Sequence, residues 1–281
     1  MKTGVIGLGA MGAGMALNFH KANVLHAIWN RTRSKADAIA AETAAAIMGS
    51  PAQMAQQCDL IVTCVSRDDD VLEVVQAIAE QVKKDVIVVD TSTVSSQTAL
   101  QAAEILKNKG AHFLDCPVSG GVEGARKGTL AMMVGGEQAI LEKARGTLAA
   151  ITGNIAYIGP TGCGQACKAV NQLMVAGINQ AVTEALAFGK SMGLNMDRVV
   201  DIVSTGAAAN WFLEHRGKTM LAGTYTPGFK VNLHHKDLTI CQKMADTSLP
   251  IVAMTLAHYQ QLMDNGYADE DISALFRIKY Q

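Results

Sequence analysis

The sequence predicts an α/β protein in which a doubly wound parallel sheet is followed by an all-helical domain, the two being joined by one long helix. Short apolar runs alternate with segments of helical period over residues 1 to about 160, as in parallel strands connected by helices. After Gly162 the alternation stops, and helical period continues through the rest of the chain. We therefore expect an α/β domain over residues 1–161 and a helical domain over residues 162–281.

A glycine-rich turn follows the first apolar strand, which ends in Val5 and Ile6. Gly7, Gly9 and Gly12 have the G-x-G-x-x-G spacing, and their place between a strand and a helix predicts a dinucleotide-binding Rossmann fold. The first glycine allows a tight turn, the second lets the backbone approach a pyrophosphate, and the third lets the helix pack on the strand. The helix N-terminus then attracts the phosphates. The cofactor-binding residues expected here are Gly7, Leu8, Gly9, Ala10, Met11 and Gly12.

The end of the second strand indicates which dinucleotide binds. Residues 25–29 form this strand, and a site that prefers NAD places an acidic residue just after it to hold the ribose hydroxyls. The first acidic residue is Asp37, which lies within the next helix, whereas Arg31 and Arg33 flank Thr32. A guanidinium pairs bidentately with a phosphate, so these residues favour NADP(H) over NAD. The alternative is a solvated basic turn that contacts no ligand.

The composition narrows the class of protein. Hydrophobic residues make up 49% of the 281 residues and charged residues 17%, which leaves apolar surface for a homodimer or homotetramer. The net charge of −1, without a long basic run, argues against nucleic acid and membrane surfaces as partners. We expect no signal peptide and no stretch of the roughly twenty apolar residues of a membrane span, and hence a cytoplasmic protein. Six cysteines without paired spacing predict reduced thiols and no metal site.

Further buried strands are expected where apolar runs recur. These runs cover residues 59–65, 86–90, 111–115 and 130–134, and they have the unbroken hydrophobicity of parallel strands covered on both faces. Ligands of such sheets bind at the carboxyl ends of the strands. Val65 and Thr93 stand at two of these ends, and we expect both at the nicotinamide half of the cofactor. Helix capping is the alternative for polar residues there, and it is the favoured interpretation for Ser95.

A serine followed by two glycines comes after the run at 111–115. Ser119, Gly120 and Gly121 offer a hydroxyl and exposed backbone N–H groups, an arrangement that suits a carboxylate. We expect these three residues to bind the substrate, with a plain turn as the alternative. The neighbouring Cys116 is expected to be a buried small residue rather than a nucleophile.

The long helix, expected over residues 164–192, carries one charge between its start and Glu184, namely Lys168. Asn171 and Gln172 follow three and four residues later, on the same helical face. Free lysine titrates near about 10.4, and burial lowers this value, which suits a general acid and base near neutral pH. We expect Lys168 to be catalytic and Asn171 to hold the substrate or orient the ammonium. The alternative is a lysine whose head snorkels into solvent.

Two more candidates lie near residue 230. We expect Phe229 to line the substrate pocket and Lys236 to reach the cofactor. His234 and His235 point about 100° apart on a helix, so they are interpreted as structural rather than as metal ligands. Trp211 is expected in the core or in the wall of a cleft. Helices are expected over residues 197–204, 210–221, 232–246, 250–265 and 269–278.

Four motifs, in order along the whole chain, resemble the β-hydroxyacid dehydrogenase family, which includes 3-hydroxyisobutyrate dehydrogenase, tartronate semialdehyde reductase and the glyoxylate/succinic semialdehyde reductases. The cofactor motif spans residues 7–18 and includes a tail of Met15, Ala16 and Asn18. The motifs that resemble those for substrate, catalysis and cofactor clasping are residues 115–121, 162–171 and 236–238. The turn of Asn30, Arg31 and Thr32 is similar to that of the NADP-using members.

The resemblance implies reversible hydride transfer between a nicotinamide and a carboxylate-bearing semialdehyde or hydroxyacid. It implies Lys168 as acid and base, Ser119 and Gly120 on the carboxylate, and Thr93 and Lys236 at the cofactor. Gln172 stands where some members have a second asparagine, so the sequence leaves open whether it or Asn171 does the polar work. An imine reductase and a cofactor-binding module without catalysis are the alternative functions. Lys168 argues against both, because such relatives usually lack or replace this lysine.

Overall fold

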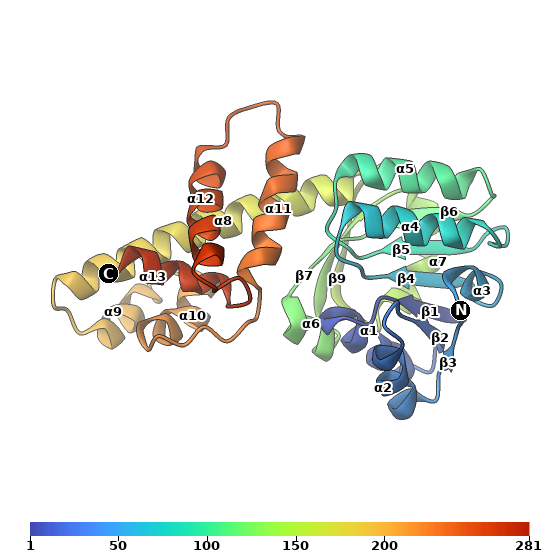
Figure 1. Cartoon of the computed structure of the whole chain (residues 1–281), viewed down its shortest axis with the longest axis horizontal. Coiled ribbons are helices and arrows are strands. Elements are labelled where there is room, and N and C mark those ends of the chain that lie inside the picture. Colours follow the sequence, from blue (N-terminus) through green and yellow to red (C-terminus); the bar gives the residue numbers. More distant parts are fainter. Residues whose placement is uncertain (281) are drawn as a thin grey trace. The chain divides into compact units, whose positions relative to one another are not determined.

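The computed structural model describes residues 1–280, which divide into two compact units at Lys168 and Ala169 (Figure 1). The first unit is a layered α/β structure, and the second is helical. The long helix α8 (Cys163–Ser191) contains the division between them. The expected fold class, a Rossmann sheet followed by a helical domain with a long connecting helix, is confirmed.

The sheet of the first unit has nine strands within the described residues, in the order β3-β2-β1-β4-β5-β6-β8-β7, with β9 paired to β8. The strands β3-β2-β1-β4-β5-β6 run parallel to one another, and this is the strand order of a dinucleotide-binding fold. The strands are β1 (Thr3–Ile6), β2 (Leu25–Trp29), β3 (Ala46–Ile47), β4 (Leu60–Thr63), β5 (Ile87–Asp90), β6 (His112–Asp115), β7 (Val118–Ser119), β8 (Leu130–Gly135) and β9 (Thr152–Gly159).

Helices cover both faces of this sheet and bury a separate apolar core on each. Successive side chains of a strand point to opposite faces, so Val5 belongs to one core and its neighbour Ile6 to the other. The first core is closed by α1 (Ala10–Lys21), α2 (Arg33–Thr43), α6 (Gly121–Lys127) and α7 (Gln138–Leu148). The second is closed by α3 (Pro51–Ala55), α4 (Asp68–Ala79) and α5 (Ser96–Lys107).

One strand runs in a direction that differs from the expectation. The run at 130–134 was expected to be a parallel strand; β8 is parallel to β9 but lies antiparallel to β6 and to β7. The connection from β6 to β8 already contains β7 and the short helix α6, and the chain returns along the sheet instead of crossing over it. Strands β3, β7 and β9 were not expected, because the first two have only two residues each and β9 is partly exposed and lacks a continuous apolar run.

The second unit packs its helices around a core of its own, which includes Leu186, Phe212, Leu238 and Tyr259. Its elements after α8 are α9 (Met196–Val203), α10 (Trp211–Leu221), α11 (Val231–Met244), α12 (Pro250–Asp264), the 3₁₀ helix η1 (Ile272–Leu275) and α13 (Phe276–Lys279). The expectation of a single helix over residues 269–278 was wrong. Asp271 accepts a hydrogen bond from the Ser273 N–H and starts a 3₁₀ turn there instead.

Helix α8 has an exposed apolar stripe along one face. Val170, Met174 and Ile178 recur every four residues and are 54, 65 and 39% exposed. The unit's other helices therefore leave one apolar stripe of α8 uncovered in the single chain.

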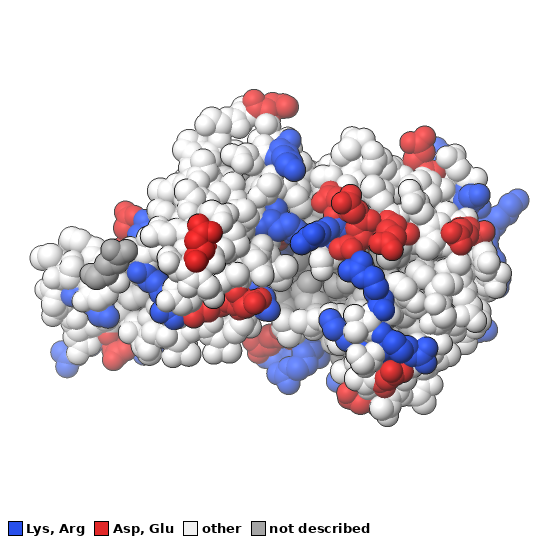
Figure 2. Space-filling view, viewed as in Figure 1, with Lys and Arg blue, Asp and Glu red and all other residues white. Residues whose placement is uncertain are grey.

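Among residues 1–280, no helix is both long and apolar enough to cross a membrane. Lysines and arginines are interspersed with acidic residues on the face shown in Figure 2.

Candidate active site

The glycine turn between β1 and α1 has the shape that a dinucleotide requires. Gly7 has a φ of +90°, and a side chain there would collide with the Cys64 carbonyl. A side chain on Gly12 would collide with the Gly7 carbonyl, so both glycines allow close packing of the backbone. A Cβ on Gly9 would meet nothing within 4 Å, which leaves open space beside the start of α1. The described residues therefore fit a pyrophosphate at this turn.

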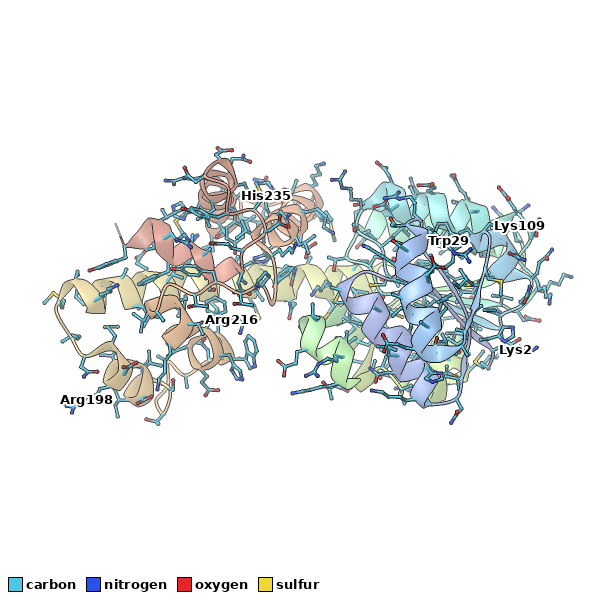
Figure 3. The ribbon with its side chains drawn as sticks, turned by 60° about the horizontal axis from the view of Figure 1, so that its bottom comes forward. Lys2, Trp29, Lys109, Arg198, Arg216 and His235 are labelled. Carbon is cyan, nitrogen blue, oxygen red and sulfur yellow. The ribbon has the colours of Figure 1, made fainter. Side chains whose placement is uncertain are left out.

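The side chain of Asn30 stabilises the glycine turn through two hydrogen bonds. Its Oδ1 accepts a hydrogen bond from the Leu8 N–H over 2.8 Å, and its Nδ2 donates to the Thr32 carbonyl over 2.9 Å. Trp29, which is labelled in Figure 3, is the last residue of β2, and Asn30 is the next residue in the chain. Thr32 precedes the first residue of α2, but its hydroxyl does not cap the helix.

Both arginines after β2 are paired with carboxylates. Arg31 Nη1 lies 3.1 Å from Asp70 Oδ1 and 3.9 Å from Glu73 Oε2, and the Arg31 side chain is 73% exposed. Arg33 pairs with Asp37 one helical turn later, over 2.9 Å. A phosphate that bound Arg31 would therefore compete with Asp70.

A buried carboxylate organises the ends of β4 and β5. Asp90 Oδ1 accepts hydrogen bonds from Thr63 Oγ1 over 2.7 Å and from Ser92 Oγ over 2.6 Å. Ser92 Oγ accepts in turn from the Val65 N–H over 2.9 Å. The loops that carry Val65 and Thr93 are thereby tied to one carboxylate, which the sequence analysis did not single out. Its only signal in the sequence was an acidic residue at the end of a buried apolar strand.

The residues after β5 also confirm the interpretation of Ser95 as a helix cap. Its hydroxyl accepts a hydrogen bond from the Thr98 N–H over 3.1 Å at the start of α5. Asp68 accepts from the Ser95 N–H over 2.9 Å and from the Thr98 hydroxyl over 2.6 Å. Burial raises the pKa of Asp68, but these hydrogen bonds outweigh it and hold the pKa below its ordinary value. Asp68 thus belongs to the capping of α5.

The expected substrate turn begins at the end of β7. Gly120 has a φ of +128° and Gly121 a φ of +61°, conformations that favour glycine, and Ser119 precedes them with its side chain partly exposed. Asn18 of α1, which is 8% exposed, donates a hydrogen bond to the Ala125 carbonyl of α6 over 2.7 Å. This hydrogen bond joins α1, which follows the glycine turn, to α6, which follows Ser119 and its two glycines.

Asp115 fixes the start of helix α8. It is completely buried, and its two oxygens accept from the N–H groups of Gly162 over 2.9 Å and Gln165 over 3.0 Å. Burial raises the pKa of Asp115 to about 6, against the lowering effect of these two bonds. Lys168 follows within the same turn and is 7% exposed, so the expected burial of this lysine is confirmed.

Gln165, which the sequence analysis missed, joins the start of α8 to the Thr93 loop. Its side-chain Nε2 donates to the Ser92 carbonyl over 2.9 Å, and its Oε1 accepts from the Val94 N–H over 3.2 Å. Gln165 precedes Lys168 by three residues, so the signal in the sequence was a second polar side chain on the face of that lysine. Gln165 therefore joins the helical turn of Lys168 to the backbone on both sides of Thr93, the residue that is expected to contact the cofactor.

A chain of polar side chains runs through the helical unit. Asn171 Nδ2 donates to Gln172 Oε1 over 2.8 Å, and Gln172 Nε2 donates to Asp237 Oδ2 over 2.6 Å. The other oxygen of Asp237 lies 2.9 Å from Lys236 Nζ. Gln172 and Asp237 are 1% and 5% exposed. The structure therefore connects two of the expected site residues, Asn171 and Lys236, through two buried ones.

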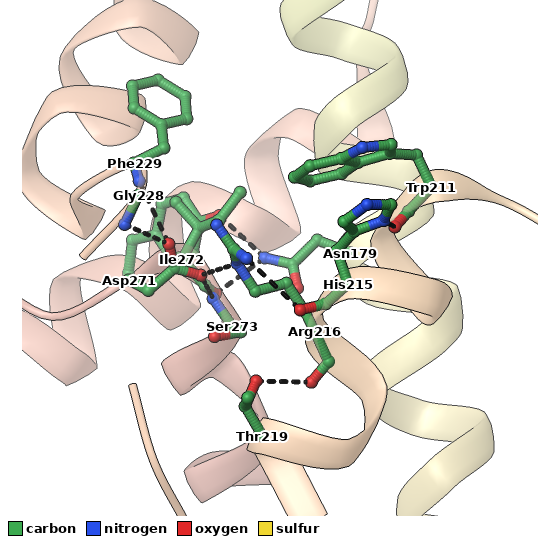
Figure 4. Close-up of polar contacts among 11 residues, drawn as sticks. Asn179, Trp211, His215, Arg216, Thr219, Gly228, Phe229, Asp271, Ile272 and Ser273 are labelled. Carbon is green, nitrogen blue, oxygen red and sulfur yellow. Dashed lines mark hydrogen bonds and ion pairs between the residues drawn. The ribbon is translucent and has the colours of Figure 1, made fainter. Parts of the chain in front are cut away.

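Phe229 is held by a second buried carboxylate of this unit. Asp271 Oδ2 accepts from the N–H groups of Gly228 over 2.9 Å and of Phe229 over 3.0 Å, while its Oδ1 lies 3.3 Å from Arg216 Nε (Figure 4). Trp211 is 58% exposed and stacks on a histidine of its own helix, which excludes the core, one of the two places expected for it, and leaves the wall of a cleft as the prediction. Helix α10 turns this ring outward and uses other side chains for the core.

His234 is buried, and both of its ring nitrogens have partners in the helical unit. Nδ1 lies 3.0 Å from the Tyr259 hydroxyl, and Nε2 lies 3.2 Å from the Gln172 carbonyl. Burial lowers the pKa of the adjacent His235. The part of the chain that the structure describes contains no cluster of three or more residues that would hold a metal ion.

None of the six cysteines, which all lie among residues 1–280, forms a disulfide bond, and Cys116 is completely buried, as expected. Burial raises the pKa of its thiol well above the ordinary value, with the carboxylates of Asp115 and Asp90 adding to the effect. A thiol with a raised pKa is a poor nucleophile.

The chain is similar to known oxidoreductases over its whole length. A family model described as the NAD binding domain of 6-phosphogluconate dehydrogenase matches residues 2–159. A second, described as NAD-binding of NADP-dependent 3-hydroxyisobutyrate dehydrogenase, matches residues 162–279. An uncharacterized oxidoreductase of Shewanella frigidimarina is 36% identical over 93% of this chain and 92% of its own length.

Two relatives with assigned names extend this similarity. The 2-hydroxy-3-oxopropionate reductase of Escherichia coli is 34% identical over 98% of this chain and 96% of its own. Among solved structures, a 3-hydroxyisobutyrate dehydrogenase of Mycobacterium tuberculosis, described with L-serine, matches with a TM-score of 0.90. It is 27% identical and the match covers 99% of both chains.

Proposed function

This chain belongs to the β-hydroxyacid dehydrogenase family, and we propose that it interconverts a short β-hydroxyacid, or a related hydroxyacid, and its semialdehyde with NADP(H). The observation that carries the proposal is Lys168, a buried lysine on a helical turn that Asp115 and Gln165 hold against the loop of Thr93. A proton donor fixed in this way suits a carbonyl reduction, in which negative charge develops on one oxygen.

The reaction requires one hydride and one proton. NADPH, when bound, supplies the hydride to the carbonyl carbon. Lys168 donates the proton to the carbonyl oxygen and takes it back from the hydroxyl in the reverse direction. Ser119, Gly120 and Gly121 bind the substrate carboxylate, which fixes the position of the carbonyl group, and Phe229 lines the pocket. Asn171 accepts a hydrogen bond from the ammonium or from the substrate hydroxyl.

The turn after β2 supports the proposed preference for NADP(H). Arg31 and Thr32 offer a guanidinium and a hydroxyl that does not cap α2, and no acidic residue precedes Asp37 in this segment. The cofactor is then held by the glycine turn, Val65, Thr93 and Lys236, with Asn30 supporting the turn. The exposed stripe of Val170, Met174 and Ile178 supports a homodimer or homotetramer.

The test is NADPH oxidation with glyoxylate and with succinic, tartronate and methylmalonate semialdehydes, run in parallel with NADH. We expect turnover of at least one acid-bearing aldehyde with NADPH preferred. Lys168→Ala should lower kcat by about 100-fold or more while NADPH binding persists. Binding of NADPH without turnover of any aldehyde would reject the proposal, and an imine substrate in the same panel separates an imine reductase from a module without catalysis.

A further inference from the structure

The hydrogen bonds that link Asn171, Gln172 and Asp237 all run in one donor-to-acceptor direction. The carboxylate of Asp237, at the buried end, sets this direction. A carboxylate only accepts hydrogen bonds, so the group that Gln172 turns toward Asp237 is its NH₂ group. The oxygen of the Gln172 amide then faces Asn171, and Asn171 must turn its own NH₂ group toward that oxygen. The oxygen of the Asn171 amide is thereby left as the end that does not bond to Gln172.

We infer that Gln172 is a positioning residue, which transmits the polarity of Asp237 to Asn171 so that Asn171 presents an oxygen at the active site. The inference rests on the proposed function, since the value of that oxygen lies in what it accepts. Lys168 is three residues before Asn171 on α8, and an ammonium or a substrate hydroxyl is a donor that an amide oxygen accepts. A reversed amide would place an NH₂ group there and oppose both.

The orientation of the Gln172 amide at the buried end of this hydrogen-bonded series is strongly fixed. The bond between Gln172 and Asp237 is 2.6 Å long and charge-assisted, and Lys236 Nζ lies 2.9 Å from the other carboxylate oxygen. Because Gln172 and Asp237 are almost completely buried, water does not compete with these bonds. The question that the sequence left open has this answer: Asn171 contacts the reacting groups, and Gln172 orients it.

Two substitutions of Gln172 separate polarity from packing. Gln172→Glu keeps an acceptor toward Asn171, because one proton shared with Asp237 preserves the order of donors and acceptors. Gln172→Met has a similar size and offers Asn171 no acceptor of comparable strength. We expect kcat to fall about 10- to 100-fold in the methionine variant, and the glutamate variant to recover at least about 10-fold of that loss near pH 6. The KM for NADPH should stay within about 2-fold of that of the unsubstituted chain in both.

Gln180 provides the matched control. It lies in the same helix, is 5% exposed, and bonds to Thr255 and His258 instead of to the polar chain. We expect Gln180→Glu and Gln180→Met to give the same kcat. Equal losses in the two variants of Gln172, or full activity of Gln172→Met, would show that the polarity of this position does not matter and would overturn the inference.

A measurement without turnover keeps the inference separate from the proposed function. The side-chain NH₂ signal of Asn171 is identified in a ¹⁵N-labelled sample as the one lost in Asn171→Asp. We expect this signal to persist near its position in Gln172→Glu, and to shift and exchange faster with water in Gln172→Met. An unsubstituted chain that reduces no aldehyde would reject the proposed function, whereas an Asn171 signal that is the same in both variants would reject the orientation by Gln172.

Discussion

The titration of Asp115 should make the stability of the α/β unit depend on pH in a direction opposite to that of most carboxylates. Burial raises the pKa of this group from 3.8 to about 6, opposed by the N–H groups of Gly162 and Gln165 and assisted by the charge of Asp90. Between these two values the folded chain holds a proton that the unfolded chain has released. The contribution of Asp115 is therefore present below about pH 4 and is lost as the pH rises through about 6.

The size of this effect follows from the two pKa values. A difference of about two pKa units, at about 1.4 kcal/mol each, corresponds to about 3 kcal/mol for the complete titration. Most of it, about 2–3 kcal/mol, falls between about pH 4 and pH 7. Asp115→Asn cannot titrate, so the free energy of unfolding of the unsubstituted chain minus that of the variant should decrease by this amount over that range.

The assay is urea unfolding followed by tryptophan fluorescence at several pH values. Trp29 lies in the α/β unit and Trp211 in the helical unit, so a Trp211→Phe background makes the signal report the first unit alone. Asp69→Asn removes an exposed carboxylate of the same unit and is the control. A difference for Asp115→Asn that is constant with pH, or that increases as the pH rises, would refute the argument that burial dominates over the two hydrogen bonds.

Two further predictions concern the cofactor end of the sheet. Asp70→Asn should release Arg31 and lower the KM for NADPH about 2- to 5-fold, since an exposed ion pair is worth at most about 1 kcal/mol, while the KM for NADH changes less. An equal change for both cofactors would contradict a role of Arg31 at the 2′-phosphate. Asn18→Ala should lower the free energy of unfolding by about 1–3 kcal/mol in denaturant titrations, because the buried Ala125 carbonyl loses its donor. A loss below about 0.5 kcal/mol would mean that packing alone joins α1 to α6.

The sequence predicted the elements whose signals are local. The glycine turn, the strand at 25–29 and the cap at Ser95 were readable because each depends on residues a few positions apart. The direction of β8 was not readable, because apolar content does not distinguish a parallel from an antiparallel strand. Strand β9 was missed for a related reason, since it is partly exposed and pairs on one side with β8.

The contacts that hold the candidate site were hidden because their partners are far apart in the chain. Asp115 bonds to backbone groups 47 and 50 residues later, and Arg31 pairs with a carboxylate 39 residues later. The roles of Asn171 and Gln172 could not be separated for the same reason. Adjacent helical side chains do not normally face each other, and the group that settles their orientation, Asp237, is 65 residues from Gln172.

These contacts share one feature, which is a buried carboxylate that accepts hydrogen bonds. The buried carboxylates among residues 1–280 are Asp90, Asp115, Asp237 and Asp271. Each accepts a hydrogen bond from a segment that carries a candidate site residue: the loop before Thr93, the helical turn of Lys168, the side chain beside Asn171, and the backbone of Phe229. A buried charge is costly unless its bonds are all satisfied, so any movement of these segments carries a large penalty. Carboxylates at these places therefore favour candidate site segments that are each held rigidly within their own unit before the substrate arrives, which lowers the cost of orienting the groups that they carry.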